Sequence, residues 1–219
     1  MIFSIRMEAS TANVLFGAIA SYVAEHDSFL TKTKLLKLLY LLDVEYYRIH
    51  RQTFTGFKWK FFHLGPWAAE FEVLLNEAVL SGALYERYGK HETPFLKAPA
   101  FVDPSRVFSG VKDELILRSM LSTWGTADTN QILDEVYFGT DPMLKGIRNE
   151  PLDFSVIHPD RPPLYKRTSS DTDPRKIARL RAQYHGDHPS AGAQRLTPPP
   201  NYDEAYESAI TALDSDEDY

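Results

Sequence analysis

Acidic residues inside a strongly apolar segment are the first candidates for chemistry in this sequence. The segment from Lys34 to Ile49, KLLKLLYLLDVEYYRI, places Asp43 and Glu45 close to six leucines. A buried carboxylate is costly unless it is paired or hydrogen-bonded. Partners within reach on the same helix are Lys37, Arg48 and the hydroxyl groups of Tyr40 and Tyr47. We therefore interpret Asp43 as a structural hydrogen-bond or ion-pair centre, in preference to a catalytic acid.

Histidines could ligate a metal or act as a base, but those of this sequence are scattered. The one close pair, His185 and His188, lies far toward the C-terminus. His63 precedes Gly65 and Pro66, where the start of a helix would favour anions. A general base at His63 is one interpretation, and a turn histidine that bonds the backbone is the one we favour. We predict no metal site and no cofactor.

Sequence signatures of the common enzyme classes are not found in this chain. It contains no cysteine, which excludes disulfides, thiolate metal sites and cysteine nucleophiles. No phosphate-binding loop, nucleophile elbow or paired-carboxylate arrangement occurs. We therefore predict that the protein is not an enzyme. The absence of cysteine is compatible with a cytoplasmic location, which we also predict.

A basic, aromatic stretch raises the possibility of nucleic-acid binding. Residues 1–60 hold eight Lys or Arg against five acidic residues, and Lys58 and Lys60 flank Trp59. Bases can stack on such an aromatic ring while the cations meet phosphates. The alternative is a strand with one solvated face and one buried face, and we favour that alternative. The formal net charge of −6 gives no overall attraction to nucleic acid or to anionic membranes.

The elements that must position these residues are mostly helices. Apolar side chains point nearly all round the Lys34–Ile49 segment, which predicts a central helix buried on several sides. That segment is too short and too interrupted by charges to span a bilayer, which needs roughly 20 apolar residues. Period-two alternation from Phe57 to Phe61 predicts a strand. Helices are predicted at about residues 10–26, 31–51, 66–81, 111–124 and 130–138, with short strands at 84–88 and 94–98 that pair with the first strand.

The fold class that follows is mainly α with a small antiparallel β element (α+β), a compact helical domain around one central buried helix. We predict that this domain covers residues 10–157. Residues 158–219 are rich in proline, first basic and then acidic, and the last 19 residues carry seven acids and no Lys or Arg. Such a composition solvates rather than packs. We expect a tail that is largely disordered or loosely docked.

Three features of this sequence resemble the Panacea domain, the SocA-like antitoxin family that also includes phage proteins of the GepA type. The first is a KLxKLLY-like signature, and the second is a Leu-Gly-Pro turn that follows it at the family's distance. The third is the later segment from Ile132 to Val136, which closes on Asp141 and Pro142. The residues that match are Lys34, Leu35, Lys37, Leu38, Leu39, Tyr40, Asp43, Gly65 and Pro66. The resemblance covers about residues 11–150. It departs from the family pattern at Leu36, Trp67 and Met143.

The resemblance implies a protein-binding antitoxin, which neutralises a toxin encoded beside it by direct contact. On that basis we expect the interface near the β element, where aromatic residues exceed what a small sheet needs to bury. The candidate protein-binding residues are Phe57, Trp59, Phe61, Trp67 and Tyr85. The alternatives are a nucleic-acid-associated regulator, which would bind through Lys58 and Lys60, and a phage or host-takeover accessory protein with the same fold. We expect no membrane partner, and the oligomeric state stays open.

Overall fold

The computed structural model describes residues 7–88 and 94–159, and the predicted tail lies outside these residues from position 160 onward. The described chain is mostly helical with two small antiparallel sheets, which confirms the predicted fold class. The helices and strands are α1 (Ala9–Glu25), α2 (Lys32–His50), β1 (Lys60–Phe62), β2 (Gly65–Trp67), α3 (Ala69–Leu80), β3 (Tyr85–Tyr88), β4 (Pro94–Lys97), α4 (Val111–Trp124), α5 (Thr129–Gly139) and α6 (Asp141–Lys145). Two short 3-10 turns are η1 (Pro104–Arg106) and η2 (Phe154–Val156).

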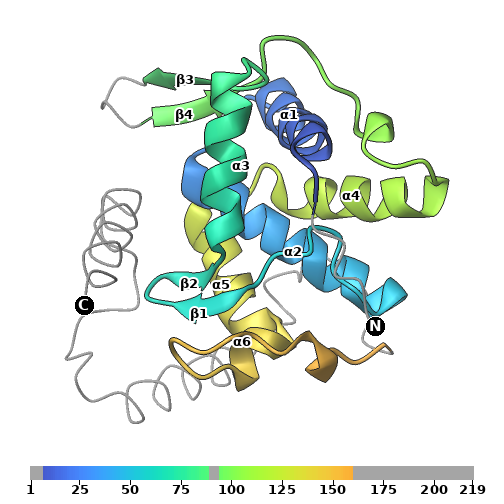
Figure 1. The fold of residues 1–219 in the computed structure, drawn as a ribbon, viewed down its shortest axis with the longest axis vertical. Helices are drawn as coiled ribbons and strands as arrows, with labels where there is room; N and C mark the ends of the chain where they lie inside the picture. Colours follow the sequence, from blue (N-terminus) through green and yellow to red (C-terminus); the bar gives the residue numbers. More distant parts are fainter. Residues whose placement is uncertain (1–6, 89–93, 160–219) are drawn as a thin grey trace. The chain divides into compact units, whose positions relative to one another are not determined.

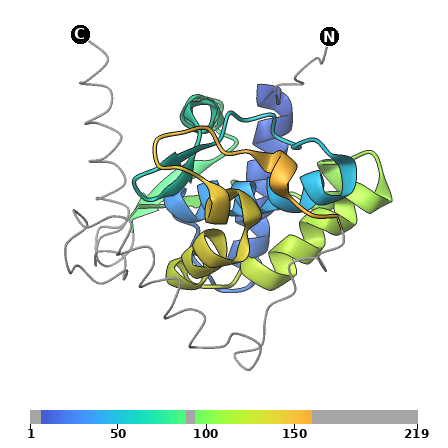
Figure 2. The ribbon, with the colours of Figure 1, turned by 90° about the horizontal axis from the view of Figure 1, so that it is seen from below.

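Helix α2 is the centre of the fold, as predicted. All six of its leucines are fully buried. Figures 1 and 2 show α2 crossing the middle of the helical unit, where it contacts α4, α5 and β2. None of the helices in the described parts of the chain is long and apolar enough to cross a membrane.

Local signals in the sequence explain where several helices begin and end. Thr31 accepts a hydrogen bond from the backbone N–H of Lys34 and so caps α2, as its sequence position predicts. Asp128 and Gln131 form a capping box at the start of α5. Helix α1 begins at Ala9, close to the predicted start, and Glu8 at its N-cap position makes no side-chain capping bond.

The β structure differs from the prediction in its pairing. Strand β1 pairs with β2 through Lys60–Trp67 and Phe62–Gly65, while β3 pairs only with β4. The Gly-Pro-Trp stretch is therefore a strand rather than the first turn of a helix, and α3 begins later, at Ala69. The prediction that residues 84–88 and 94–98 pair with the first strand is wrong for the same reason, since β2 occupies one side of β1.

The other side of β1 is occupied by the chain that follows α6. Phe61 donates its backbone N–H to the carbonyl of Glu150 and accepts from the N–H of Asn149. Leu152 donates to the carbonyl of Trp59, just before the strand. Strand β1 is thus enclosed on both edges, and its partner β2 contacts α2.

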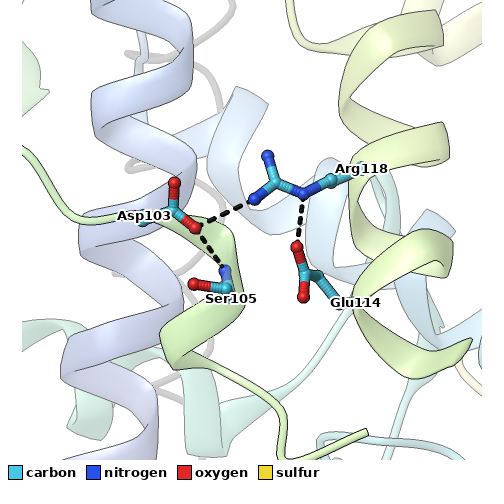
Figure 3. Close-up of polar contacts among 4 residues, drawn as sticks. All are labelled: Asp103, Ser105, Glu114 and Arg118. Atoms are coloured by element: carbon cyan, nitrogen blue, oxygen red, sulfur yellow. Dashed lines mark hydrogen bonds and ion pairs between the residues drawn. The ribbon is translucent and has the colours of Figure 1, made fainter. Parts of the chain in front are cut away.

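A surface cluster of charges joins η1 to α4. The Arg118 guanidinium donates to Asp103 at 2.9 Å and to Glu114 at 2.6 Å, and Asp103 also accepts from the backbone N–H of Ser105 (Figure 3). All these groups are solvated, and ion pairs of this kind stabilise by less than about 1 kcal/mol. The cluster is therefore a tether for the loop before α4 rather than a candidate for chemistry.

Candidate functional site

The residues with the most unusual chemistry form a row on α2. Lys34, Lys37, Tyr40 and Asp43 stand three positions apart, and each is buried. Side chains at such spacing lie on successive turns of a helix. Each of them reaches a different segment of the chain, so the row connects α2 to much of the domain.

Asp43 is the hydrogen-bond centre that the sequence predicts, although its partners are different. One carboxylate oxygen accepts from the backbone N–H groups of Phe54 and Thr55, at 2.8 and 2.9 Å. The other accepts from the hydroxyl of Thr55 and, at 2.7 Å, from the indole N–H of Trp59. Burial raises the pKa of Asp43 to about 6, and these hydrogen bonds oppose that rise. The carboxylate therefore holds the 54–59 loop against α2.

Lys37 performs the same task for β2. Its fully buried ammonium donates to the carbonyl of Pro66 at 2.9 Å. Gly65 has a φ of +103°, and a Cβ at that position would lie 3.4 Å from the Lys37 Nζ. Burial lowers the pKa of Lys37 to about 7. The Gly-Pro pair of the predicted motif thus supplies a glycine that tolerates this φ and the carbonyl group that Lys37 bonds.

Tyr40 anchors the junction between α5 and α6. Its hydroxyl lies 3.0 Å from the Oγ1 of Thr140, and Thr140 donates its own proton to the carbonyl of Val136 at 2.7 Å. The tyrosine is therefore the donor of the pair. Its ring packs edge-on against Trp59 and Phe154, and burial raises the pKa of Tyr40.

Lys34 closes the row at the start of α2. Its ammonium donates to the hydroxyl of Ser28 at 3.1 Å. Burial lowers the pKa of Lys34 to about 8, and the charge of Asp128 partly offsets this. The matched residues between these polar positions, Leu35, Leu38 and Leu39, are fully buried core. Every α2 residue of the predicted family motif is thus internal, and the row is a scaffold rather than a surface that a partner could touch.

The structure corrects three of the five predicted protein-binding residues. Phe57, Trp59 and Phe61 are only 5%, 2% and 6% exposed. They are buried because the loop and strand that carry them are drawn onto α2 by Asp43 and enclosed by the chain after α6. The surplus of aromatics is used inside the domain. Trp67 and Tyr85 are half-buried and so remain accessible in part.

The basic stretch has the solvated-face arrangement that we favoured. Lys58 and Lys60 are exposed, while Trp59 between them points inward to Asp43. A base cannot stack on a ring that is buried and hydrogen-bonded in this way. The hypothesis that Trp59 stacks on a base while Lys58 and Lys60 bind phosphates is therefore wrong for Trp59.

His63 lies at the turn between β1 and β2 and is exposed. Its Nδ1 lies 3.0 Å from the guanidinium of Arg148. Partial burial and the Arg148 charge lower the pKa of His63. Within residues 7–88 and 94–159, no three His, Asp or Glu side chains gather closely enough to hold a metal ion.

A surface that the sequence reasoning missed lies on the β3–β4 hairpin. The strand register places Tyr85, Arg87, Phe95 and Lys97 on one face. The Arg87 guanidinium lies 5.7 Å from the Tyr85 ring centre and the Lys97 ammonium 5.6 Å from that of Phe95. We name these four residues, together with Phe29, the hairpin face; the Phe29 ring is 65% exposed and packs edge-on against Phe95 at 5.2 Å.

The signal for the hairpin face was present in the sequence. Tyr85 with Arg87, and Phe95 with Lys97, each repeat an aromatic and a cation at period two. Residues two apart in a strand share a face. The repeat predicts a shared surface only when the pairing of the two strands is known, because the pairing places Tyr85 and Arg87 beside Phe95 and Lys97.

No protein-family model, curated protein or solved structure matches this chain. The Panacea resemblance therefore stays a prediction that rests on the motif residues alone.

Proposed function

We propose that this protein is an antitoxin-type binding module, which neutralises a partner toxin in the cytoplasm by direct contact and without catalysis. The observation that carries the proposal is the hairpin face, where two cations and two aromatic rings of the β3–β4 ribbon, partly or fully exposed, lie together with the exposed ring of Phe29. Aromatic residues and arginine are the side chains most enriched at the energetic centres of protein interfaces.

The buried row on α2 supports a binding role in a different way. The pKa values of Lys37, Tyr40 and Asp43 depart far from their ordinary range, and such groups often mark catalytic sites. Here each is fully buried and bonded to the protein's own backbone or side chains. These contacts favour a structural role for the row, as a scaffold that supports a binding surface, over a catalytic role.

The test is purification of the tagged protein from its native cells, washed at low and at high salt. One protein retained in roughly equal amount through both washes is the expected result, because an interface with an aromatic centre survives the screening of charges. That protein, expressed alone, should arrest growth, and co-expression of this chain should restore it. Absence of any retained protein would contradict the proposal.

Matched variants locate the contact. Tyr85→Ala with Arg87→Glu should abolish retention, while Lys58→Glu with Lys60→Glu should leave it unchanged. Both double variants alter exposed or half-buried residues in a strand or just before one, so the comparison separates a lost contact from a general effect on folding.

A second candidate function, nucleic-acid binding, is favoured by one observation on the β1–β2 hairpin. Lys60 lies directly opposite the half-buried Trp67, so a cation and an aromatic share one face of this hairpin, although not at Trp59. Bound nucleic acid that is lost at high salt, and that Lys58→Glu with Lys60→Glu abolishes, would establish this function instead.

A further inference from the structure

The two strands of the β3–β4 hairpin differ in the backbone hydrogen bonds that their outer edges form. Leu96 donates its backbone N–H to the carbonyl of Leu30 at 2.7 Å, so this group of β4 points away from β3. In an antiparallel ladder, opposed residues either exchange both backbone bonds or direct all of them outward. Leu96 lies opposite Glu86, which makes this an outward-directed pair.

The same alternation fixes the rest of β3. Tyr88 lies two residues beyond Glu86 and opposite Pro94, which has no N–H to give to the ladder. This agrees with an outward-directed pair at Tyr88 as well. Glu86 and Tyr88 therefore present their N–H and C=O groups at the outer edge of β3.

Nothing in the described ranges, 7–88 and 94–159, forms a backbone hydrogen bond to that edge. Figure 1 shows β3 as the outer strand of the hairpin, with β4 on its inner side. Glu86, Arg87 and Tyr88 are all exposed. By contrast, β1 is enclosed on both edges by β2 and by the chain after α6. A strand with an unpaired edge is a template for another strand.

We propose that the outer edge of β3 accepts an extended segment of the partner protein as an added strand, and that this segment is acidic on the side that meets Arg87. The inference rests on the proposed function, since it names how the partner is held. Backbone bonds to Glu86 and Tyr88 supply the attachment, as in other cases of strand addition.

Charge selects the segment. Among the described residues, neither Arg87 nor Lys97 forms an ion pair, and the hairpin face carries no acidic side chain. A neighbouring strand places its side chains beside those of β3 on each face. A carboxylate on the hairpin face would meet Arg87, whereas a carboxylate on the opposite face would meet Glu86 and be repelled.

The experiment uses the full chain and a fluorescein-labelled peptide of alternating glutamate and valine. A peptide with threonine in place of glutamate is the charge control. The glutamate peptide should bind in fluorescence anisotropy, and it should slow hydrogen exchange at the Glu86 and Tyr88 amides. The threonine peptide should bind more weakly, by up to about fivefold, since it brings no carboxylate to Arg87.

Glu86→Pro is the decisive variant, because it removes an edge N–H that is not part of the β3–β4 ladder. It should weaken binding by up to about tenfold, the effect of one lost backbone bond. Glu86→Ala keeps the N–H and should not weaken binding. Arg87→Glu should reverse the preference between the two peptides, which tests the proposal even if Glu86→Pro fails to fold.

Three results would overturn the strand-addition proposal: no binding of the glutamate peptide, equal binding by the folded Glu86→Pro variant, or binding without protection of the two amides. The toxin partner distinguishes this failure from that of the proposed function. If that partner is retained by Glu86→Pro and lost by Tyr85→Ala with Arg87→Glu, the hairpin face is the interface and strand addition is wrong. If no partner is retained by the unaltered chain, the proposed function itself fails.

Discussion

At the scale of single residues, Asp43 and Lys37 have opposite pKa shifts and so act in different pH ranges. Burial raises the pKa of Asp43 from 3.8 to about 6. Its contribution to stability is complete below about pH 4 and is lost as the pH rises through 6. Burial lowers the pKa of Lys37 from 10.5 to about 7, so its contribution is complete above about pH 10 and is lost as the pH falls through 7.

Both groups are charged between about pH 6 and 7, and their contribution to the free energy of unfolding should be lowest there. Urea unfolding at a series of pH values should show stability rising from pH 7 to 8, by at most about 1.4 kcal/mol from one titrating group. Lys37→Met should reduce that rise. An unchanged slope in the variant would show that Lys37 does not titrate in this range. Lys34, with a pKa lowered to about 8, acts in the same direction at higher pH and serves as the comparison.

Trp59 offers a second test at this scale, because its ring packs in the core and its N–H reaches Asp43. Trp59→Phe keeps most of the ring and removes one donor, which should cost about 1–3 kcal/mol of unfolding free energy. It should also raise the pKa of Asp43 further, since that hydrogen bond lowers it. Trp59→Ala should cost about 3–5 kcal/mol. If Trp59→Ala instead left stability intact, the side chain would not be part of the core.

At the scale of elements, the helices were predictable and the strand pairing was not. The leucines of α2 and the caps at Thr31 and Asp128 are local signals, and local signals determine where helices begin and end. The β1–β2 turn depends on Lys37, which lies 29 residues before the Pro66 carbonyl that it bonds. A local sequence pattern cannot predict a contact between residues that are so far apart in the chain.

In the candidate site, too, the local features were predictable and the contacts between distant segments were not. Asp43 was predictable as a hydrogen-bond centre, because a carboxylate among leucines must be satisfied. Its partners were not, because Thr55 and Trp59 arrive from a loop whose path the sequence does not specify. The prediction that these aromatic residues are exposed was wrong for the same reason. Phe57, Trp59 and Phe61 exceed what a small sheet needs to bury, but they pack inside the domain.

Gly65 tests the link between turn and helix. Its φ of +103° disfavours any side chain, and a Cβ would also lie 3.4 Å from the Lys37 Nζ. Gly82 is the matched control, with a φ of +75° and no heavy atom within 4 Å of the added Cβ. Gly65→Ala and Gly82→Ala should each cost roughly 1–3 kcal/mol from backbone strain, and Gly65→Ala should cost more, because its φ lies farther from the left-handed region that other residues can adopt. Equal losses in chemical denaturation would show that this difference in φ adds nothing.

At the scale of the whole molecule, the prediction that remains is the division near residue 158. The described residues, 7–88 and 94–159, belong to one compact unit. Its last described contacts are strong: Ile157 is buried, and Arg51 donates to the Ile157 carbonyl at 2.7 Å. The core is thus closed before the proline-rich stretch begins.

A fragment that ends at Pro163 should therefore unfold in one cooperative transition, with a midpoint within about 2 °C of the full chain, since a change of 1 kcal/mol would move it by roughly 2–4 °C for a domain of this size. The fragment keeps the whole hairpin face, so it should also retain the partner protein. A second fragment that ends at Asn149 removes the chain that encloses β1 and should lose stability, because Phe61 and Trp59 would then each lose a backbone partner. If the fragment ending at Pro163 also unfolded early, the C-terminal residues would belong to the core, and the predicted boundary would be wrong.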